Sequence, residues 1–150
     1  MQSKVLHTDA GQTTYLLVFD PGEEAVEGLT RFAGEHDIAA AHLSAIGALG
    51  QATLGFFEID RKEYRKLPVD EQVELLSMTG NIARDEKEQP RLHAHVVLGK
   101  RDGSTVGGHL LEARVRPTLE VVLVESPPHL RRRERPEIGL ALIDLGSAGE

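Results

Sequence analysis

The sequence predicts a single domain of the α/β (α+β) class, built on a mainly antiparallel β-sheet. Strand-forming segments outnumber helical ones and closely spaced turns separate them, which favours antiparallel pairing. A strand at residues 13–19 is followed at once by a helix, which indicates a layered arrangement of helix on sheet. No internal repeat, linker or low-complexity run divides the 150 residues, a length that suits one domain with its own core.

The composition excludes several classes of protein. The chain has no cysteine, which excludes disulfide scaffolds, thiolate zinc sites and a cysteine nucleophile, and is compatible with the cytoplasm, where we expect the protein to act. No apolar run approaches the ~20 residues of a membrane span, and the first residues lack the apolar region of a secretory signal. The net charge of −7 argues against nucleic-acid binding as the default function, because an acidic protein repels a phosphate backbone.

The helix is predicted to begin directly after the strand at residues 13–19. Asp20 fits the N-cap, Pro21 the first helical position, and Glu23 the third position of a capping box. Residues 34–37 end the helix. Its apolar side chains recur at helical spacing and predict one buried face, formed by Val26, Leu29, Phe32 and Ala33.

The middle of the chain is predicted to supply several strands. Residues 38–59 read as two strands, bent or bulged at the glycines that interrupt them. Residues 60–70 predict a hairpin or surface loop around Tyr64. Residues 72–79 predict a further strand that ends in a turn at Gly80-Asn81.

The last third of the chain is predicted to hold a hairpin and two more strands. The hairpin, residues 91–110, follows a solvated loop at residues 84–90. Residues 119–125 predict a buried strand that stops at Pro127-Pro128, and residues 138–145 predict a last short strand.

Three histidines on the predicted hairpin suggest a metal site. His93 and His95 are two residues apart, so on a strand they point to the same face, and His109 returns toward them on the second strand. Three neutral imidazoles suit zinc and leave a fourth position open. The alternative is that all three are exposed or structural histidines, and the spacing alone does not decide between the two.

The register of this hairpin imposes a condition on the metal site. Asp102-Gly103 predicts a type I′ turn, which would place His109 opposite Val96 and therefore on the wrong face. A β-bulge at Gly107-Gly108 would move His109 opposite Val97 and bring it diagonal to His95. The site therefore requires a bulge or kink at these glycines, or ligands drawn from two subunits.

One basic cluster offers a different kind of site. Its arginines could contact phosphates, which would make them nucleic-acid-binding residues. The alternative is a solvated loop whose arginines pair with the many carboxylates of the chain. The cluster consists of Arg131, Arg132, Arg133 and Arg135.

Several segments together resemble the PPC domain, whose name means plant and prokaryote conserved. They are residues 46–49, 54–57, 75–82, 92–96, 102–103, 107–110 and 119–122, and the resemblance extends over roughly residues 8–145. It implies a strongly bent, largely antiparallel sheet with a packed helix, and a homotrimer. In plant relatives the domain follows an AT-hook in nuclear DNA-binding proteins, and no AT-hook is present in this sequence. Some free-standing prokaryotic members look like metal binders through the histidines that match His93, His95 and His109.

These observations support three possible functions. The first is a cytoplasmic PPC homotrimer with a three-histidine site for zinc or another divalent transition metal, whose open position holds water or a small anionic ligand. If it is an enzyme, the metal would activate a water or polarise a carbonyl. The second is a DNA-associated regulatory protein that uses the arginine cluster, and the third is a structural trimer that binds a partner.

Overall fold

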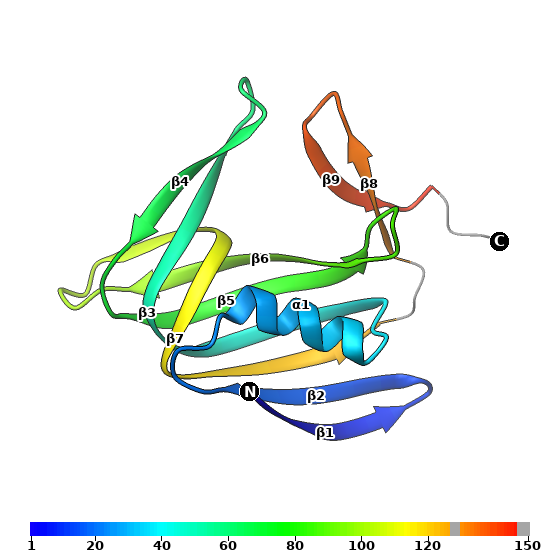
Figure 1. The fold of residues 1–150 in the computed structure, drawn as a ribbon, viewed down its shortest axis with the longest axis horizontal. Coiled ribbons are helices and arrows are strands. Elements are labelled where there is room, and N and C mark those ends of the chain that lie inside the picture. Colours follow the sequence, from blue (N-terminus) through cyan, green and yellow to red (C-terminus); the bar gives the residue numbers. More distant parts are fainter. Residues whose placement is uncertain (127–129, 147–150) are drawn as a thin grey trace.

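The computed structural model describes residues 1–126 and 130–146. This part of the chain forms one helix and a nine-stranded sheet (Figure 1). Four of the strands pair in a ring, because β3 (Ala40–Glu58) and β6 (Pro90–Gly99) each pair with both β5 (Val73–Arg84) and β7 (Thr105–Glu125). All pairings are antiparallel except a single parallel bridge between β5 and β8 (Arg131–Arg135). The predicted bent, largely antiparallel sheet with a helix is confirmed.

The helix α1 (Ala25–Glu35) buries the predicted apolar face against the sheet, apart from the partly buried Val26. Its predicted start at Asp20 is wrong. Residues 20–23 form a tight turn in which the Glu23 amide donates to the Asp20 carbonyl at 3.3 Å, and Gly22 has a φ of +87°, which no helix can accommodate. The N-cap is Glu24, whose carboxylate accepts the Glu27 amide at 2.7 Å.

The two longest strands run through positions where the sequence predicted interruptions. β3 is one strand of 19 residues rather than two, and shifts of its register near Gly47 and beyond take up the bend. Its first half pairs with β5, and its second half pairs with β4 (Glu63–Val69), which confirms the hairpin around Tyr64. β7 is also continuous, over 21 residues.

Two local predictions are wrong and one strand was missed, because pairing with neighbouring strands outweighs local sequence preference. β5 continues through Gly80-Asn81, where Gly80 pairs with Leu43 on one side and Ala94 on the other. Residues 131–135 form strand β8, which pairs with β9 (Leu140–Asp144), so the basic cluster is not a loop. The N-terminal strand β1 (Gln2–Asp9), which pairs with β2 (Gln12–Phe19), was not predicted.

The remaining predictions have mixed outcomes. β2, β9 and the end of β7 confirm the strands predicted at residues 13–19, 138–145 and 119–125. The predicted stop at Pro127-Pro128 lies outside the described residues. The described part of the chain has no helix with the length and apolarity that crossing a membrane requires.

The sheet separates a buried face from an open one. The helix covers the buried face, where Ala94, Val96 and Leu98 of β6 join the core. Alternate residues of the same strand, His93, His95 and Val97, point to the open face. In Figure 1 the β3–β4 hairpin and the β8–β9 hairpin rise on the same side of the view, near opposite ends of β6.

Candidate metal centre

The turn of the histidine hairpin differs from the predicted type I′ turn. The Gly103 amide donates to the Lys100 carbonyl at 3.0 Å, and the Lys100 amide donates to the Ser104 carbonyl at 2.9 Å. Gly103 has a φ of +83°, so this is a three-residue loop in which a type I turn is followed by a glycine bulge. The Asp102 carboxylate accepts the Ser104 amide at 2.9 Å and holds the loop.

This loop brings the three histidines onto one face without a second bulge. The extra residue lies in the turn, which shifts the register so that His109 pairs directly with His95. The pairing continues regularly through Gly108 opposite Val96 and Gly107 opposite Val97. The predicted bulge or kink at Gly107-Gly108 is therefore wrong, and one subunit alone brings the three imidazoles together.

The three imidazole rings form a nearly equilateral triangle. Their centroids are 5.2 Å apart for His93 and His95, 5.1 Å for His93 and His109, and 5.3 Å for His95 and His109. The Nε2 atoms of His93 and His95 are 3.2 Å apart, and one ring nitrogen from each histidine lies within 4.8 Å of the others. Among the described residues, His93, His95 and His109 form a group of three potential ligands that could hold a metal ion.

An aromatic contact fixes the ring of His109. Tyr64 of β4 stacks on it with ring centroids 4.7 Å apart and an angle of 23° between the planes. Gly55 of β3 lies opposite His109 in the register, and a Cβ at Gly55 would come within 2.7 Å of the Tyr64 ring. The missing side chain at Gly55 therefore makes room for Tyr64 to cover His109.

Burial keeps two of the histidines neutral at ordinary pH. It is the main cause that lowers the pKa of His109 to about 4, and the neighbouring His93, His95 and Arg132 lower it further. The pKa of His93 is also lowered, chiefly by burial and then by the charges of Arg132 and His95. The neutral imidazole is the form that binds a metal ion.

The residues present fit a metal ion. Two nitrogen ligands at roughly 2.0–2.1 Å from a tetrahedral zinc ion are about 3.3 Å apart, close to the 3.2 Å between the Nε2 atoms of His93 and His95. The buried Nδ1 of His109 has no hydrogen-bond partner among the described residues. A buried polar atom without a partner is costly, and coordination is one way to satisfy it.

The arginine cluster divides into three paired residues and one buried residue. Arg131 contacts Glu88 at 3.4 Å, Arg133 contacts Asp144 at 3.1 Å, and Arg135 contacts Asp144 at 3.8 Å. Arg132 points the other way and is only 6% exposed. It lines a cavity with His93 and His109, so the structure brings one of the four arginines to the histidine cluster.

Sequence reasoning missed Tyr64 and the position of Arg132 beside the histidines. In strand β8, Arg132 points to the face opposite to that of Arg131 and Arg133. The sequence of this segment shows no apolar–polar alternation, so it did not predict the strand that separates these side chains. For Tyr64 the sequence holds no comparable signal, because its contact with His109 depends on the pairing of β3 with both β4 and β7.

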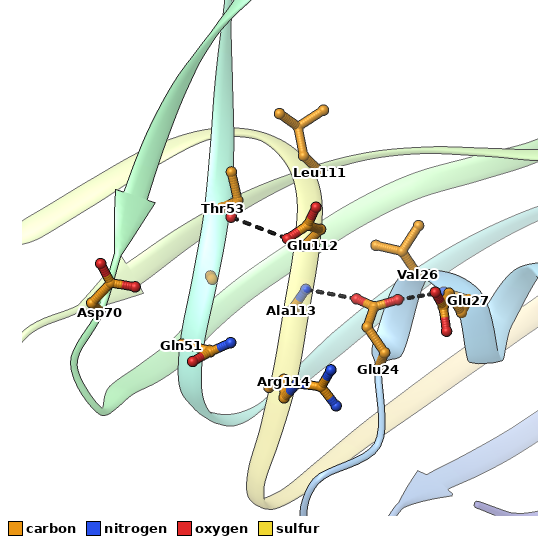
Figure 2. A pocket seen from close by; sticks show the side chains of 11 residues that line it. Glu24, Val26, Glu27, Gln51, Thr53, Asp70, Leu111, Glu112, Ala113 and Arg114 are labelled. Carbon is orange, nitrogen blue, oxygen red and sulfur yellow. Dashed lines mark hydrogen bonds between the residues drawn. The ribbon is translucent and has the colours of Figure 1, made fainter.

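A second hollow, of about 380 Å³, lies where α1 begins against β3 and β7 (Figure 2). Its acidic side chains include Glu24, which bridges the amides of Glu27 and Ala113, both at 2.7 Å. Arg114 donates to the Gly22 carbonyl at 3.0 Å. These bonds tie the helix start to β7, and the three histidines lie outside this hollow.

A ring of four paired strands that carries three clustered histidines on its open face defines a β-rich domain with a candidate metal centre. The chain belongs to the Plants and Prokaryotes Conserved (PCC) domain family, whose model matches residues 6–127. This confirms the resemblance seen in the sequence. No curated protein matches the chain.

Three solved structures resemble this chain over most of its length. A plant- and prokaryote-conserved (PPC) protein of Pyrococcus horikoshii is 34% identical, with a TM-score of 0.82, over 87% of this chain and 90% of its own. A metal-containing protein of Archaeoglobus fulgidus is 36% identical, with a TM-score of 0.80, over 95% and 96%. A candidate DNA-binding protein of Bacteroides thetaiotaomicron is 34% identical, with a TM-score of 0.83, over 87% and 91%.

Proposed function

We propose that this protein is a homotrimer that binds a divalent transition metal, most favourably zinc, through His93, His95 and His109. The observation that carries the proposal is the triangle of imidazole rings with centroids 5.1–5.3 Å apart, built by a single hairpin. The metal-containing relative of Archaeoglobus fulgidus, at 36% identity, supports it. A cytoplasmic location stays a prediction from the sequence.

The chemistry at such a site follows from three neutral ligands. A bound divalent ion keeps its full charge and an open position, at which it can lower the pKa of a water or polarise a carbonyl. The chain itself contributes the shape around that position: Tyr64 covers one side of His109, and the exposed His95 leaves the other side open. If the protein is an enzyme, this site would therefore catalyse a metal-dependent reaction on a small ligand.

The open face of the sheet supports self-association. Cross-strand partners share a face, and the pairs His95–Thr79, Thr79–Ser44 and Ser44–Val122 connect the metal cluster to Val122. The exposed apolar side chains on the strands of this ring include Ile46, Leu76, Val97 and Val122. Burial of this surface would stabilise an oligomer, and the resemblance to the family supports a trimer.

The metal proposal is tested by metal analysis of the purified protein. We expect about one zinc or similar ion per chain in the wild type, and its loss in His93→Ala and in His109→Ala while both variants stay folded. His7→Ala is the matched control, because His7 lies on β1, away from the cluster, and should keep the metal. Undiminished metal in both cluster variants would refute the proposal.

A DNA-associated function is the second candidate, and the candidate DNA-binding relative of Bacteroides thetaiotaomicron favours it. It would rest on Arg131, Arg133 and Arg135, which would have to exchange Glu88 and Asp144 for phosphates. Such binding weakens steeply as salt is raised. No binding of duplex DNA at low salt would exclude this function.

A further inference from the structure

Arg132 is a buried cation that the protein leaves partly unsatisfied. Its Nη1 donates to the Ala141 carbonyl at 3.2 Å, and its Nη2 donates to the Asn81 side-chain oxygen. The buried Nε has no hydrogen-bond partner among the described residues, and within them no carboxylate forms an ion pair with this guanidinium. A guanidinium has five N–H groups and keeps its charge, so a buried one of this kind calls for an anion.

The position of Arg132 ties it to the candidate metal centre. Asn81, which holds its Nη2, pairs directly with His93 across β5 and β6 and therefore shares its face. Arg132, His93, His109 and Tyr64 line a cavity of about 210 Å³. That volume is far larger than one water molecule needs, and it is enough for a small organic molecule.

The charges around this cavity favour an anion. A divalent metal on three neutral imidazoles together with Arg132 places three positive charges in one small site. Asp85 also lines the cavity, but it already accepts Arg91 at 2.7 Å and the amides of Lys87 and Gln89. Glu134, the other acidic lining residue, is exposed to solvent.

The remaining walls indicate the kind of anion. Apolar side chains form much of the lining, namely Leu92, Leu140, Ala141 and Leu142. Inorganic phosphate would leave these walls without a contact, whereas the carbon chain of an organic acid would cover them. A planar carboxylate also matches the fork of a guanidinium.

We propose that Arg132 binds the carboxylate of a small organic acid, whose carbon chain lies on the leucine-lined wall beside the three histidines. This inference deepens the proposed metal site and rests on it for the identity of the second binding group, the ion on His93, His95 and His109. Arg132 is then a ligand-binding residue, and the ligand spans the guanidinium and the metal. Arg131 pairs with Glu88, and Arg133 and Arg135 pair with Asp144, so these three arginines take no part.

The test uses butyrate as the probe and inorganic phosphate as the contrast, each titrated calorimetrically into the purified protein after its metal content has been measured. We expect butyrate to bind more tightly than phosphate, and Arg132→Gln to weaken butyrate at least tenfold without loss of metal. Arg132→Lys keeps the positive charge but lacks the guanidinium fork, so its butyrate affinity should lie between those of the wild type and Arg132→Gln. Arg133→Gln, one residue along the same strand, is the matched control and should bind butyrate like the wild type.

Each outcome decides the inference. Equal butyrate affinity in the wild type and Arg132→Gln, with metal present in both, would overturn it and leave the metal site intact. The purified wild type could contain no metal while Arg132→Gln still abolishes butyrate binding. That result would refute the metal proposal and uphold the role of Arg132. If Arg132→Gln does not fold, the Nε resonance of Arg132 in the wild type must shift with butyrate, and an unchanged resonance overturns the inference.

Discussion

His109 is the residue on which most contacts of the candidate site converge. It pairs with His95 on one side and with Gly55 on the other, and Tyr64 stacks on its ring. These contacts remove the imidazole from water, which is why its pKa falls to about 4. The same burial that prepares the ring for a metal makes the metal-free protein sensitive to acid.

This sensitivity predicts how the stability of the metal-free protein depends on pH. The folded-state pKa of His109, about 4, lies below the unfolded value of about 6.5, so the unfolded chain takes up the proton first as pH falls. The stabilisation is complete above pH ~6.5 and is lost as pH falls toward ~4. We expect the free energy of unfolding to drop by about 1 kcal/mol between pH 7 and pH 5, after allowance for solvent screening.

Urea denaturation in the presence of a chelator measures this drop. His109→Gln removes the titrating group, so its stability should depend less on pH over the same range. The pKa of His93 is lowered too, so its protonation also reduces stability as pH falls. Some pH dependence should therefore remain in His109→Gln. An identical dependence in His109→Gln and the wild type would contradict the assignment.

At the scale of residues, the sequence predicted that the three histidines would cluster, but it did not predict their surroundings. The spacing of His93 and His95 placed both on one face, and the return strand brought His109 to them. The register was predicted incorrectly, because the loop at residues 101–103 holds one residue more than a type I′ turn, and a local sequence of Asp-Gly is compatible with both. Tyr64 and Arg132 reach the site through pairings that no local pattern encodes.

The start of α1 shows how a single side chain connects an element to the sheet. Glu24 caps the helix through the Glu27 amide and also accepts the amide of the buried Ala113 in β7 (Figure 2). The sequence predicted the cap at Asp20, since Asp20, Pro21 and Glu23 match a common N-terminal pattern. Gly22 allows the tight turn that delays the helix and brings Glu24 against β7.

We therefore expect Glu24→Ala to destabilise the protein more than a helix cap alone would. The substitution removes two hydrogen bonds and leaves the Ala113 amide buried without a partner, which should cost about 2 kcal/mol. Glu24→Gln keeps an amide oxygen as an acceptor and should lose about half as much. Chemical denaturation measures both.

Glu35→Ala is the matched control for the cap. Glu35 lies at the other end of the same helix, is exposed, and contacts Arg31 at 3.9 Å, so its loss should change stability by less than about 0.5 kcal/mol. Equal effects of Glu24→Ala and Glu35→Ala would show that the bonds of Glu24 contribute nothing.

Whole elements were predicted where their apolar pattern is strong and missed where it is weak. The buried strands and the helix carry clear periodicity. β1 is exposed along its whole length and β8 consists largely of arginines, so neither shows the alternation that identifies a strand. Both are strands because they lie beside a partner, β2 for the first and β9 for the second.

At the scale of the molecule, the ring formed by β3, β5, β6 and β7 has two faces with different tasks. One is covered by α1 and forms the core. On the other face, the exposed fraction is 61% for Ile46, 51% for Leu76 and 43% for Val97. Such an exposed apolar surface is typical of an interaction site. The three clustered histidines lie on this second face, so association through it would also cover the exposed His95.

We expect Ile46→Asp to convert the proposed trimer into monomers. Ile46 lies on the open face and contributes little to the core, so the folded monomer should tolerate the change. A symmetric trimer formed through this face would instead bury three new carboxylates. Light scattering during size-exclusion chromatography measures the mass, and circular dichroism checks the fold. Val5→Asp, an equally apolar exposed position on β1, is the control and should remain trimeric. An unchanged mass for Ile46→Asp would remove this face as the site of association.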